Sequence, residues 1–329
     1  MYYIGRKMQL TVFGESHGKG VGALITGLPP GHRINPAAID REMARRKPGA
    51  YGTPRKEPDS WEILSGIYRG HTTGMPLAIW VPNLDPRPDD YTDMPFRPGH
   101  ADYTAHIKYR GAEDPRGGGH FSGRLTAPLV AAGAILKDIL KPLGVTVTSN
   151  VAAVGGKSDP KEIQAALARA KAEKDSLGGI VDLCIAGVPA GIGGPRFRGL
   201  ESGLSAAYFA LGAVKGVSFG AGFDAANKKG SENNDPFRIK GGAVVTETNH
   251  AGGILGGIAT GSDIVAHIAV KPTPTIGKEQ NTVDRSGKEI SFAATGRHDT
   301  AIVLRIPVAL EAMSALVILD EIALVRGEL

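Results

Sequence analysis

Five glycine-containing blocks of the chain carry histidine, arginine and aspartate side chains, and they are the segments best suited to chemistry. In chain order the blocks are Gly14-Glu15-Ser16-His17-Gly18, Arg97-Pro98-Gly99-His100-Ala101-Asp102, Arg116-Gly117-Gly118-Gly119-His120-Phe121-Ser122-Gly123-Arg124, Asn249-His250-Ala251-Gly252-Gly253 and Gly296-Arg297-His298-Asp299. Glycine lets the backbone take positive φ angles and approach a ligand closely, while histidine exchanges protons near neutral pH. One such block is a turn, but five together indicate a site that binds an anionic ligand and moves protons.

The charge pattern favours a small anionic ligand over nucleic acid. The net charge is +5, with 38 Lys and Arg residues against 33 Asp and Glu residues. The arginines stand beside glycine, proline and histidine rather than in runs, and only 6% of the residues are aromatic. Stacking platforms for bases are therefore not expected, and we expect no nucleic-acid partner. A basic nucleic-acid-binding protein remains the hypothesis from a different class, and any single arginine could instead be solvated on the surface.

Cysteine usage and hydropathy favour a cytoplasmic protein with no membrane partner. Cys184 is the single cysteine, which rules out an internal disulfide framework and fits a reducing compartment. The first residues contain no apolar stretch of the kind that a signal peptide needs. The most apolar stretch, 312–319, is far shorter than the roughly 20 residues of a membrane-spanning helix.

Hydrophobic spacing predicts an α+β fold, and 329 residues are enough for one large domain or two ordinary ones. Helices are predicted from Pro36, with Asn35 as the N-cap, and over 126–140, 160–174, 205–214 and 307–324. Strands are predicted over 11–13, 23–26, 63–67, 77–81, 145–154, 180–186, 244–246, 264–271 and 301–306. The helix over 126–140 is apolar nearly all round, which is typical of a buried helix. Strands and helices do not alternate regularly, so buried helices between antiparallel sheets fit better than a doubly wound parallel sheet.

Two long segments rich in proline, aspartate and arginine, 47–60 and 82–99, interrupt these elements. Loops of this kind often cover active sites. The alternative is that both segments are mobile surface loops.

Taken in order, the blocks resemble the chorismate synthase family. The resemblance also includes Gly27-Leu28-Pro29-Pro30-Gly31, Gly187-Val188-Pro189-Ala190-Gly191, Ile254-Leu255-Gly256-Gly257 and Lys271-Pro272-Thr273. It runs from about residue 5 to about residue 325, which is essentially the whole chain. The sequence departs from the usual pattern at His120-Phe121, where an Arg-Ser pair is common.

The resemblance implies a carbon–oxygen lyase that converts 5-enolpyruvylshikimate 3-phosphate into chorismate and phosphate. The reaction is a 1,4-anti elimination, the last step of the shikimate pathway of aromatic amino acid biosynthesis, and it requires reduced FMN without net redox change. The implied fold is a β-α-β sandwich with helices between antiparallel sheets, assembled as a homotetramer and supplied by an external flavin reductase. The alternative is a flavin-dependent reductase, or a bifunctional form that uses NADPH. No Gly-x-Gly-x-x-Gly fingerprint follows a strand here.

The resemblance also implies roles for particular residues. His17 would protonate the departing phosphate, His100 would protonate or stabilise the reduced flavin, and Asp299 would help the flavin N5 atom act as a base. Carboxylates and phosphate on the substrate require convergent arginines. The substrate-binding candidates are Arg46, Arg97, Arg124 and Arg297, with Arg55 and Arg116 as weaker ones. The predicted flavin contacts are His120, Phe121, Ser122, Ala213, Gly256, Lys271, Pro272, Thr273, Pro274, Thr275 and Arg297.

Each of these residues has a plainer interpretation. His17 and His100 could be structural hydrogen-bonding groups, and Asp299 could form a salt bridge with an arginine. Glycine pairs alone predict only turns. His100, Asp102 and His106 are residue types that bind metals, but with one cysteine and no fourth ligand the sequence predicts no metal site.

Overall fold

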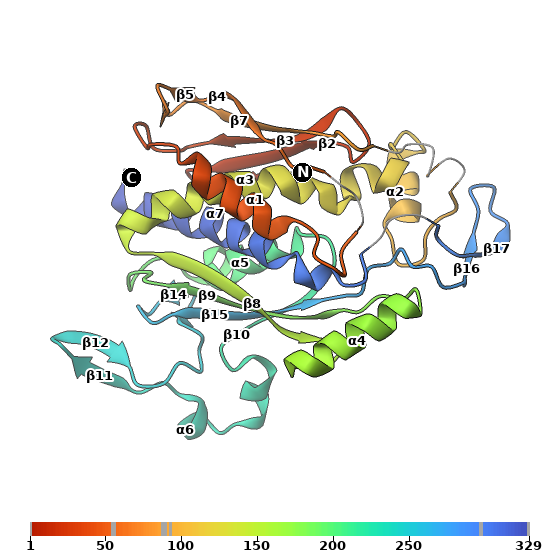
Figure 1. Cartoon of the computed structure of the whole chain (residues 1–329). Coiled ribbons are helices and arrows are strands. Elements are labelled where there is room, and N and C mark those ends of the chain that lie inside the picture. Colours follow the sequence, from red (N-terminus) through yellow and green to blue (C-terminus); the bar gives the residue numbers. More distant parts are fainter. Residues whose placement is uncertain (1, 54–56, 87–90, 92–93, 296–298, 328–329) are drawn as a thin grey trace.

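Two antiparallel sheets enclose a layer of helices in this protein (Figure 1), whose computed structural model describes residues 2–53, 57–86, 91, 94–295 and 299–327. The first sheet has the strand order β1 (Tyr2–Ile4), β2 (Gln9–Gly14), β3 (Gly20–Thr26), β7 (Leu77–Pro82) and β4 (Glu62–Ser65). The second has the order β10 (Val214–Phe219), β15 (Ile264–Val270), β9 (Gly179–Ala186) and β8 (Thr146–Val154). The α+β sandwich predicted from the sequence is confirmed.

Four helices form the middle layer: α1 (Pro36–Arg46), α3 (Thr126–Leu140), α5 (Leu200–Phe209) and α7 (Pro307–Arg326). Helices α3 and α7 pack against each other, α3 also contacts β3 and β7, and α7 contacts β8 and β9. Both helices are therefore buried between apolar layers, which explains why they carry apolar residues nearly all round. The two helices approach each other closely at Gly133, because a Cβ there would collide with the Cβ of Ala312.

Strand register places alternate side chains against these helices. In β9 the buried residues are Val181, Leu183 and Ile185, and the residues between them face away from the helix layer. Ile185 pairs with Ile264 of β15, which continues the same alternation. This two-residue period is the one expected of strands with one buried face.

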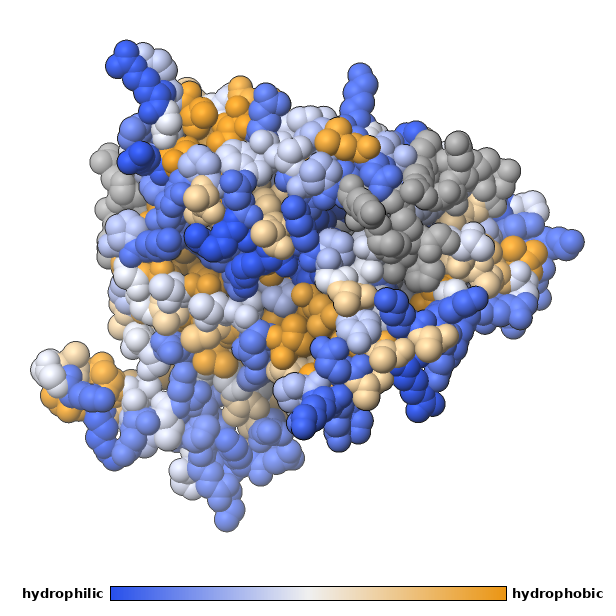
Figure 2. Space-filling model, in the orientation of Figure 1, coloured by the Kyte–Doolittle hydropathy of each residue, from blue (hydrophilic) through white to orange (hydrophobic). Residues whose placement is uncertain are grey.

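Smaller elements surround the sandwich. Helix α2 (Asp102–Tyr109) and the hairpin of β16 (Gln280–Val283) and β17 (Glu289–Phe292) lie together at one end, and α4 (Pro160–Ala172) packs on β8 (Figure 1). The remaining elements are β5 (Ile67–Tyr68), β6 (His71–Thr72), α6 (Gly230–Asn233), β11 (Phe237–Lys240), β12 (Ala243–Thr246), β13 (Ile254–Leu255) and β14 (Ile258–Ala259). Figure 2 shows that apolar side chains are exposed on the outlying β11–β12 hairpin, where Phe237, Ile239 and Val244 are each more than half exposed.

Several predicted elements are confirmed with their expected start signals. Helix α1 begins at Pro36, and the Asn35 side chain accepts a hydrogen bond from the Ala38 N–H at 3.3 Å. Helix α3 spans Thr126–Leu140 as predicted. Asp159 caps α4 by accepting hydrogen bonds from two backbone N–H groups.

Three predicted elements differ from the structure. The strand over 301–306 is instead the 3-10 helix Ile302–Leu304, whose backbone turns directly into α7 and buries Val303 between the layers. The helix over 205–214 lies earlier, at Leu200–Phe209, because Ala213 takes a left-handed φ of 75° and Val214 begins β10. The predicted strand 63–67 is interrupted at Gly66, which has a φ of 86° and separates β4 from β5.

None of the described helices has both the length and the apolar character needed to cross a membrane.

Candidate active site

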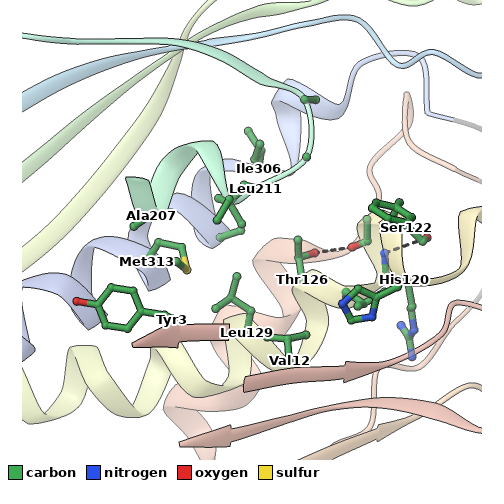
Figure 3. Close-up of a pocket in the computed structure, with 18 of the residues that line it drawn as sticks. Tyr3, Val12, His120, Ser122, Thr126, Leu129, Ala207, Leu211, Ile306 and Met313 are labelled. Carbon is green, nitrogen blue, oxygen red and sulfur yellow. Dashed lines mark hydrogen bonds between the residues drawn. The ribbon is translucent and has the colours of Figure 1, made fainter. Parts of the chain in front are cut away.

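A cavity of about 1590 Å³ lies between the first sheet and the helix layer. Its apolar part is built by Tyr3, Leu129, Leu211, Ile306 and Met313, which converge from β1, α3, the turn after α5 and the start of α7 (Figure 3). The volume exceeds the roughly 300–1,000 Å³ of a pocket for one drug-sized ligand. The cavity therefore has room for more than one such ligand.

The polar part of the same cavity collects histidines and arginines from distant segments. The predicted residues on its wall are His17, Arg46, Arg97, His100, His120, Phe121, Ser122, Arg124, Ala213, Lys271, Thr273, Pro274, Thr275 and Asp299. The fold thus brings residues from four of the five sequence blocks to one place, whereas the block Asn249–Gly253 does not line the cavity.

His17 and His100 lie on the two sides of one glycine segment. A Cβ at Gly117 would collide with the His17 imidazole, and a Cβ at Gly118 would lie 2.8 Å from Cε1 of His100. Both glycines have positive φ angles, 59° and 80°, which a side chain rarely tolerates. The Ser16 N–H also donates to the Gly119 carbonyl at 3.1 Å. Glycine at 117 and 118 is therefore required for close packing against both imidazoles.

A carboxylate that the sequence analysis did not assign holds His100 and Arg97 together. Asp102 accepts hydrogen bonds from Nε and Nη2 of Arg97 at 2.6 and 2.8 Å and approaches Nδ1 of His100 at 2.6 Å. Burial alone would raise the pKa of the Asp102 carboxyl, but the hydrogen bonds from Arg97 and His100 outweigh it and hold that pKa well below its usual value. A charged Asp102 fixes the orientation of the imidazole at the cavity wall.

Arg46 and Arg124 share a second buried carboxylate. Arg46 ends α1, and its Nη1 lies 3.0 Å from Oδ2 of Asp59, while Nη1 of Arg124 contacts the other oxygen. Burial lowers the pKa of Arg46 to about 9, and the positive charges of Arg305 and Arg124 act in the same direction. An anion beside these guanidinium groups would stabilise their charged forms.

Two hydrogen bonds fix the backbone turn that carries Arg124 into the cavity. The Thr126 hydroxyl donates to the Gly123 carbonyl at 2.7 Å, and the Ser122 hydroxyl accepts from the Arg124 N–H at 3.3 Å (Figure 3). These bonds shape the 3-10 helix Gly123–Leu125 that leads into α3. His120, in the preceding segment, approaches the Gly14 carbonyl through Nδ1 at 3.2 Å.

Asp299 is anchored by an arginine in the structure. Nη1 of Arg305 lies 2.9 and 3.0 Å from its two oxygens, and the Thr53 N–H donates to Oδ1 at 2.8 Å. Arg305 also donates to the Arg46 carbonyl at 3.1 Å. The salt bridge that the sequence analysis kept as the plainer interpretation is therefore present, and the carboxylate still lies on the cavity wall.

The segment after β15 offers polar groups to the cavity. The Lys271 ammonium donates to the Gly99 carbonyl at 2.5 Å, and Thr275 accepts a hydrogen bond from Arg97 at 3.1 Å. The hydroxyl oxygen of Thr273 is buried and makes no hydrogen bond with any described residue. A buried polar atom of this kind normally has a partner, which an ordered water or a ligand would supply.

Some predicted residues are not brought to this cavity. Gly256 is in the turn of the β13–β14 hairpin, Pro272 does not line the cavity, and Arg116 is held at the surface by Asp114 at 2.7 Å. Arg297 and Arg55 lie outside the described residues. Within the described part of the chain, no three His, Cys, Asp or Glu side chains are grouped to hold a metal ion.

The structure adds residues that sequence reasoning missed. Tyr91 packs edge-on against the His17 imidazole, with ring centroids 4.8 Å apart. Asp59, Asp102 and Arg305 bind predicted site residues, as described above. Asp102 was visible inside a recognised block, whereas nothing in the sequence around Asp59 or Arg305 shows which arginine or carboxylate each one meets.

Comparison with known proteins assigns the family. The family model described as chorismate synthase matches residues 8–323. A chorismate synthase from Pyrococcus abyssi is 45% identical over 97% of this chain and 96% of its own length. One from Chitinophaga pinensis is 47% identical over the same shares of the two chains. A crystal structure of a chorismate synthase superposes with a TM-score of 0.78 at 27% identity, covering 99% of this chain and 94% of the other.

These matches span nearly the whole chain and agree with the sandwich fold and with the order of the sequence blocks, so the chain belongs to the chorismate synthase family of lyases.

Proposed function

We propose that the cavity is the place where this chain carries out the reaction of its family, the elimination of phosphate from 5-enolpyruvylshikimate 3-phosphate to give chorismate. The observation that carries the assignment to this cavity is the pairing of His17 and His100 across Gly117 and Gly118, next to buried arginines. A multiply anionic substrate satisfies the arginines, and a proton donor beside them suits the departure of phosphate.

His17 is proposed as the group that gives a proton to the departing phosphate. Breaking the allylic C–O bond builds negative charge on the leaving oxygen, and a general acid with nearby cations lowers that barrier. The imidazole is buried in the turn between β2 and β3 and lines the polar part of the cavity. Arg46, Arg97 and Arg124 then bind the carboxylates and phosphate through directed N–H groups.

The second ligand of the cavity is proposed to be FMN in its reduced form. The donor set fits it, since apolar walls suit a fused ring system, while Lys271, the buried Thr273 hydroxyl and the backbone around Ser122 suit its polar groups. Reduced FMN supplies this family with transient electron density for breaking the C–O bond. The proposed flavin contacts are His120, Phe121, Ser122, Ala213, Lys271, Thr273, Pro274 and Thr275.

His100 and Asp299 are proposed to hold charge and protons beside the two ligands. Asp102 keeps the His100 imidazole oriented, and Arg305 keeps the Asp299 carboxylate on the wall. An anchored carboxylate loses little freedom when a ligand binds, which is the advantage of preorganised groups.

An anaerobic assay tests the function directly. Purified protein is mixed with the substrate and dithionite-reduced FMN, and chorismate and phosphate are measured. We expect both products in equal amounts, and none when FMN is left oxidised. Release of phosphate without chorismate, or product formation without flavin, would contradict the proposal. A parallel assay for NADPH oxidation tests the reductase alternative, for which we expect no activity.

The remaining proposals concern assembly and supply. We propose one domain over residues 1–329, a cytoplasmic homotetramer and an external flavin reductase as the source of reduced FMN. Exposed apolar residues on the β11–β12 hairpin support assembly, because contiguous exposed apolar side chains commonly mark protein contacts. Sedimentation of the purified protein tests the tetramer, and a monomer at micromolar concentration would contradict it. Salt-dependent DNA binding, the mark of the nucleic-acid hypothesis, is not expected.

A further inference from the structure

Asp59 occupies an unusual position between the two buried arginines of the site. Asp59 is 4% exposed and has a left-handed φ of 55°. Aspartate and asparagine adopt this conformation more often than most other residues. It lies just before β4, at the end of segment 47–60, whereas Arg46 ends α1 and Arg124 precedes α3. Three separate elements therefore meet at one carboxylate.

Among the described residues, the remaining hydrogen bonds of the two guanidinium groups are with neutral oxygens. Nε of Arg46 donates to the Thr126 hydroxyl at 2.9 Å, and its Nη2 donates to the Gly123 carbonyl at 3.0 Å. In Arg124, Nε donates to the Asn83 side-chain oxygen at 2.9 Å, and Nη2 donates to the Pro82 carbonyl at 3.0 Å. The nearest other carboxylate is Glu57, 3.9 Å from Nη2 of Arg124.

This pattern fixes both guanidinium planes and leaves part of each free for an anion. Each guanidinium group has five N–H donors, and the bonds among described residues engage Nε, Nη1 and Nη2 of each arginine once. The Asp59 side chain is only 2% exposed, and each of its two oxygens is engaged by one of the arginines. Burial would raise the pKa of Asp59, but the charges of Arg46 and Arg124 outweigh this and lower it.

We propose that Asp59 is a positioning residue that holds Arg46 and Arg124 at a fixed separation and orientation, so that both bind the anionic groups of one substrate molecule. It acts through the arginines and does not touch the substrate. The inference rests on the proposed function, because it takes these arginines as substrate-binding groups. Its main consequence is that charge at position 59 controls the affinity for the substrate rather than the affinity for the flavin.

The first test is Asp59→Asn, because asparagine tolerates the left-handed backbone and keeps one acceptor oxygen while losing the charge. We expect the KM for the substrate to rise at least about ten-fold, as found when a buried charged hydrogen-bond partner is removed, with kcat changed less than about three-fold. The dissociation constant of FMN should not change. The matched control is Asp138→Asn on α3, which removes a surface partner of Lys141 away from the cavity and should leave KM unchanged.

A double-mutant cycle with Arg124→Lys separates positioning from general loosening of the fold. Lysine keeps the charge but lacks the planar fork that Asp59 orients. If Asp59 acts through Arg124, Asp59→Asn should raise KM less in the Arg124→Lys background than in the unaltered protein. Equal effects in both backgrounds would overturn the inference.

If the Asp59→Asn variant does not fold, chemical rescue of a second variant tests the same inference. Asp59→Gly removes the side chain, and glycine adopts this φ without strain. Added formate should occupy the vacated space and lower the raised KM of this variant, while chloride at equal ionic strength should not. No rescue, or a KM at or below that of the unaltered protein in either variant, would refute positioning by Asp59. Absence of chorismate formation by the unaltered protein would instead refute the proposed function.

Discussion

The pairing of two histidines across a glycine segment gives a sharp prediction for Gly118→Ala. In the unaltered protein Gly118 has φ 80° and ψ 7°, and a Cβ there would lie 2.8 Å from Cε1 and 3.0 Å from Nε2 of His100. His100 is not free to retreat, because Nδ1 is held by Asp102 at 2.6 Å and Arg97 lies at 3.1 Å. The substitution therefore has to displace the imidazole by several tenths of an ångström.

Gly144 provides a control with nearly the same backbone and no neighbour. It has φ 81° and ψ 6°, and a Cβ at this position meets nothing within 4 Å. The left-handed conformation costs an alanine about 1–2 kcal/mol at either position. Gly144→Ala should therefore be destabilised by about 1–2 kcal/mol. Each kcal/mol lowers the midpoint of thermal unfolding by about 2–4 °C. Gly118→Ala should lose at least as much stability as the control.

The two variants should differ in activity. A misplacement of about 1 Å at a reacting group costs about 100-fold in rate, so a smaller displacement of His100 should lower the kcat of Gly118→Ala by roughly ten-fold. Gly144→Ala should keep the kcat of the unaltered protein. The assay is anaerobic chorismate formation with reduced FMN at a temperature well below both unfolding midpoints. Equal kcat values for the two variants would refute the argument that Gly118 positions His100.

Three further predictions concern catalysis, acid stability and packing. His17→Ala should lower kcat by roughly 10²–10⁴-fold, the range for a lost general acid, while FMN titration shows unchanged binding; a kcat near that of the unaltered protein would exclude the acid role. Burial would raise the pKa of Glu311, but hydrogen bonds and charges from its basic neighbours hold it below its usual 4.5. The charged Glu311 carboxylate therefore stabilises the protein at pH values above 4.5. This stabilisation is lost as the pH falls through the lowered pKa of Glu311. Glu311→Gln should be less stable near neutral pH and should lose less on acidification, as measured by urea unfolding; an acid loss equal to that of the unaltered protein would count against this. Gly133→Ala should destabilise by about 1–3 kcal/mol, because the new methyl group collides with Ala312 and overpacks the contact between α3 and α7. The control is Gly203→Ala in α5, whose Cβ would meet only a Val317 methyl group at 3.3 Å. It should be neutral or stabilising when the thermal unfolding midpoints of both variants are compared with that of the unaltered protein.

Local signals were enough for elements whose start and buried face are written in consecutive residues. Asn35 before Pro36 predicted the beginning of α1, and the continuous apolar character of 126–140 predicted a buried helix, because capping and hydrophobic burial depend on neighbours along the chain. The same reasoning failed at 301–306. The apolar spacing there is typical of a strand. In the structure the segment forms a 3-10 helix that leads into α7 and buries Val303.

For the site, the sequence by itself determined which residue types are present and in which order, and this sufficed for the family and for His17, His100 and the arginines as candidates. Only the tertiary structure decided their partners. Asp59 is 65 residues from Arg124 in the chain and yet forms an ion pair with it. Local patterns carry no information about contacts at such separations, because packing of the sheets against the helix layer brings these segments together. The orientation of each functional side chain is therefore a property of the whole fold.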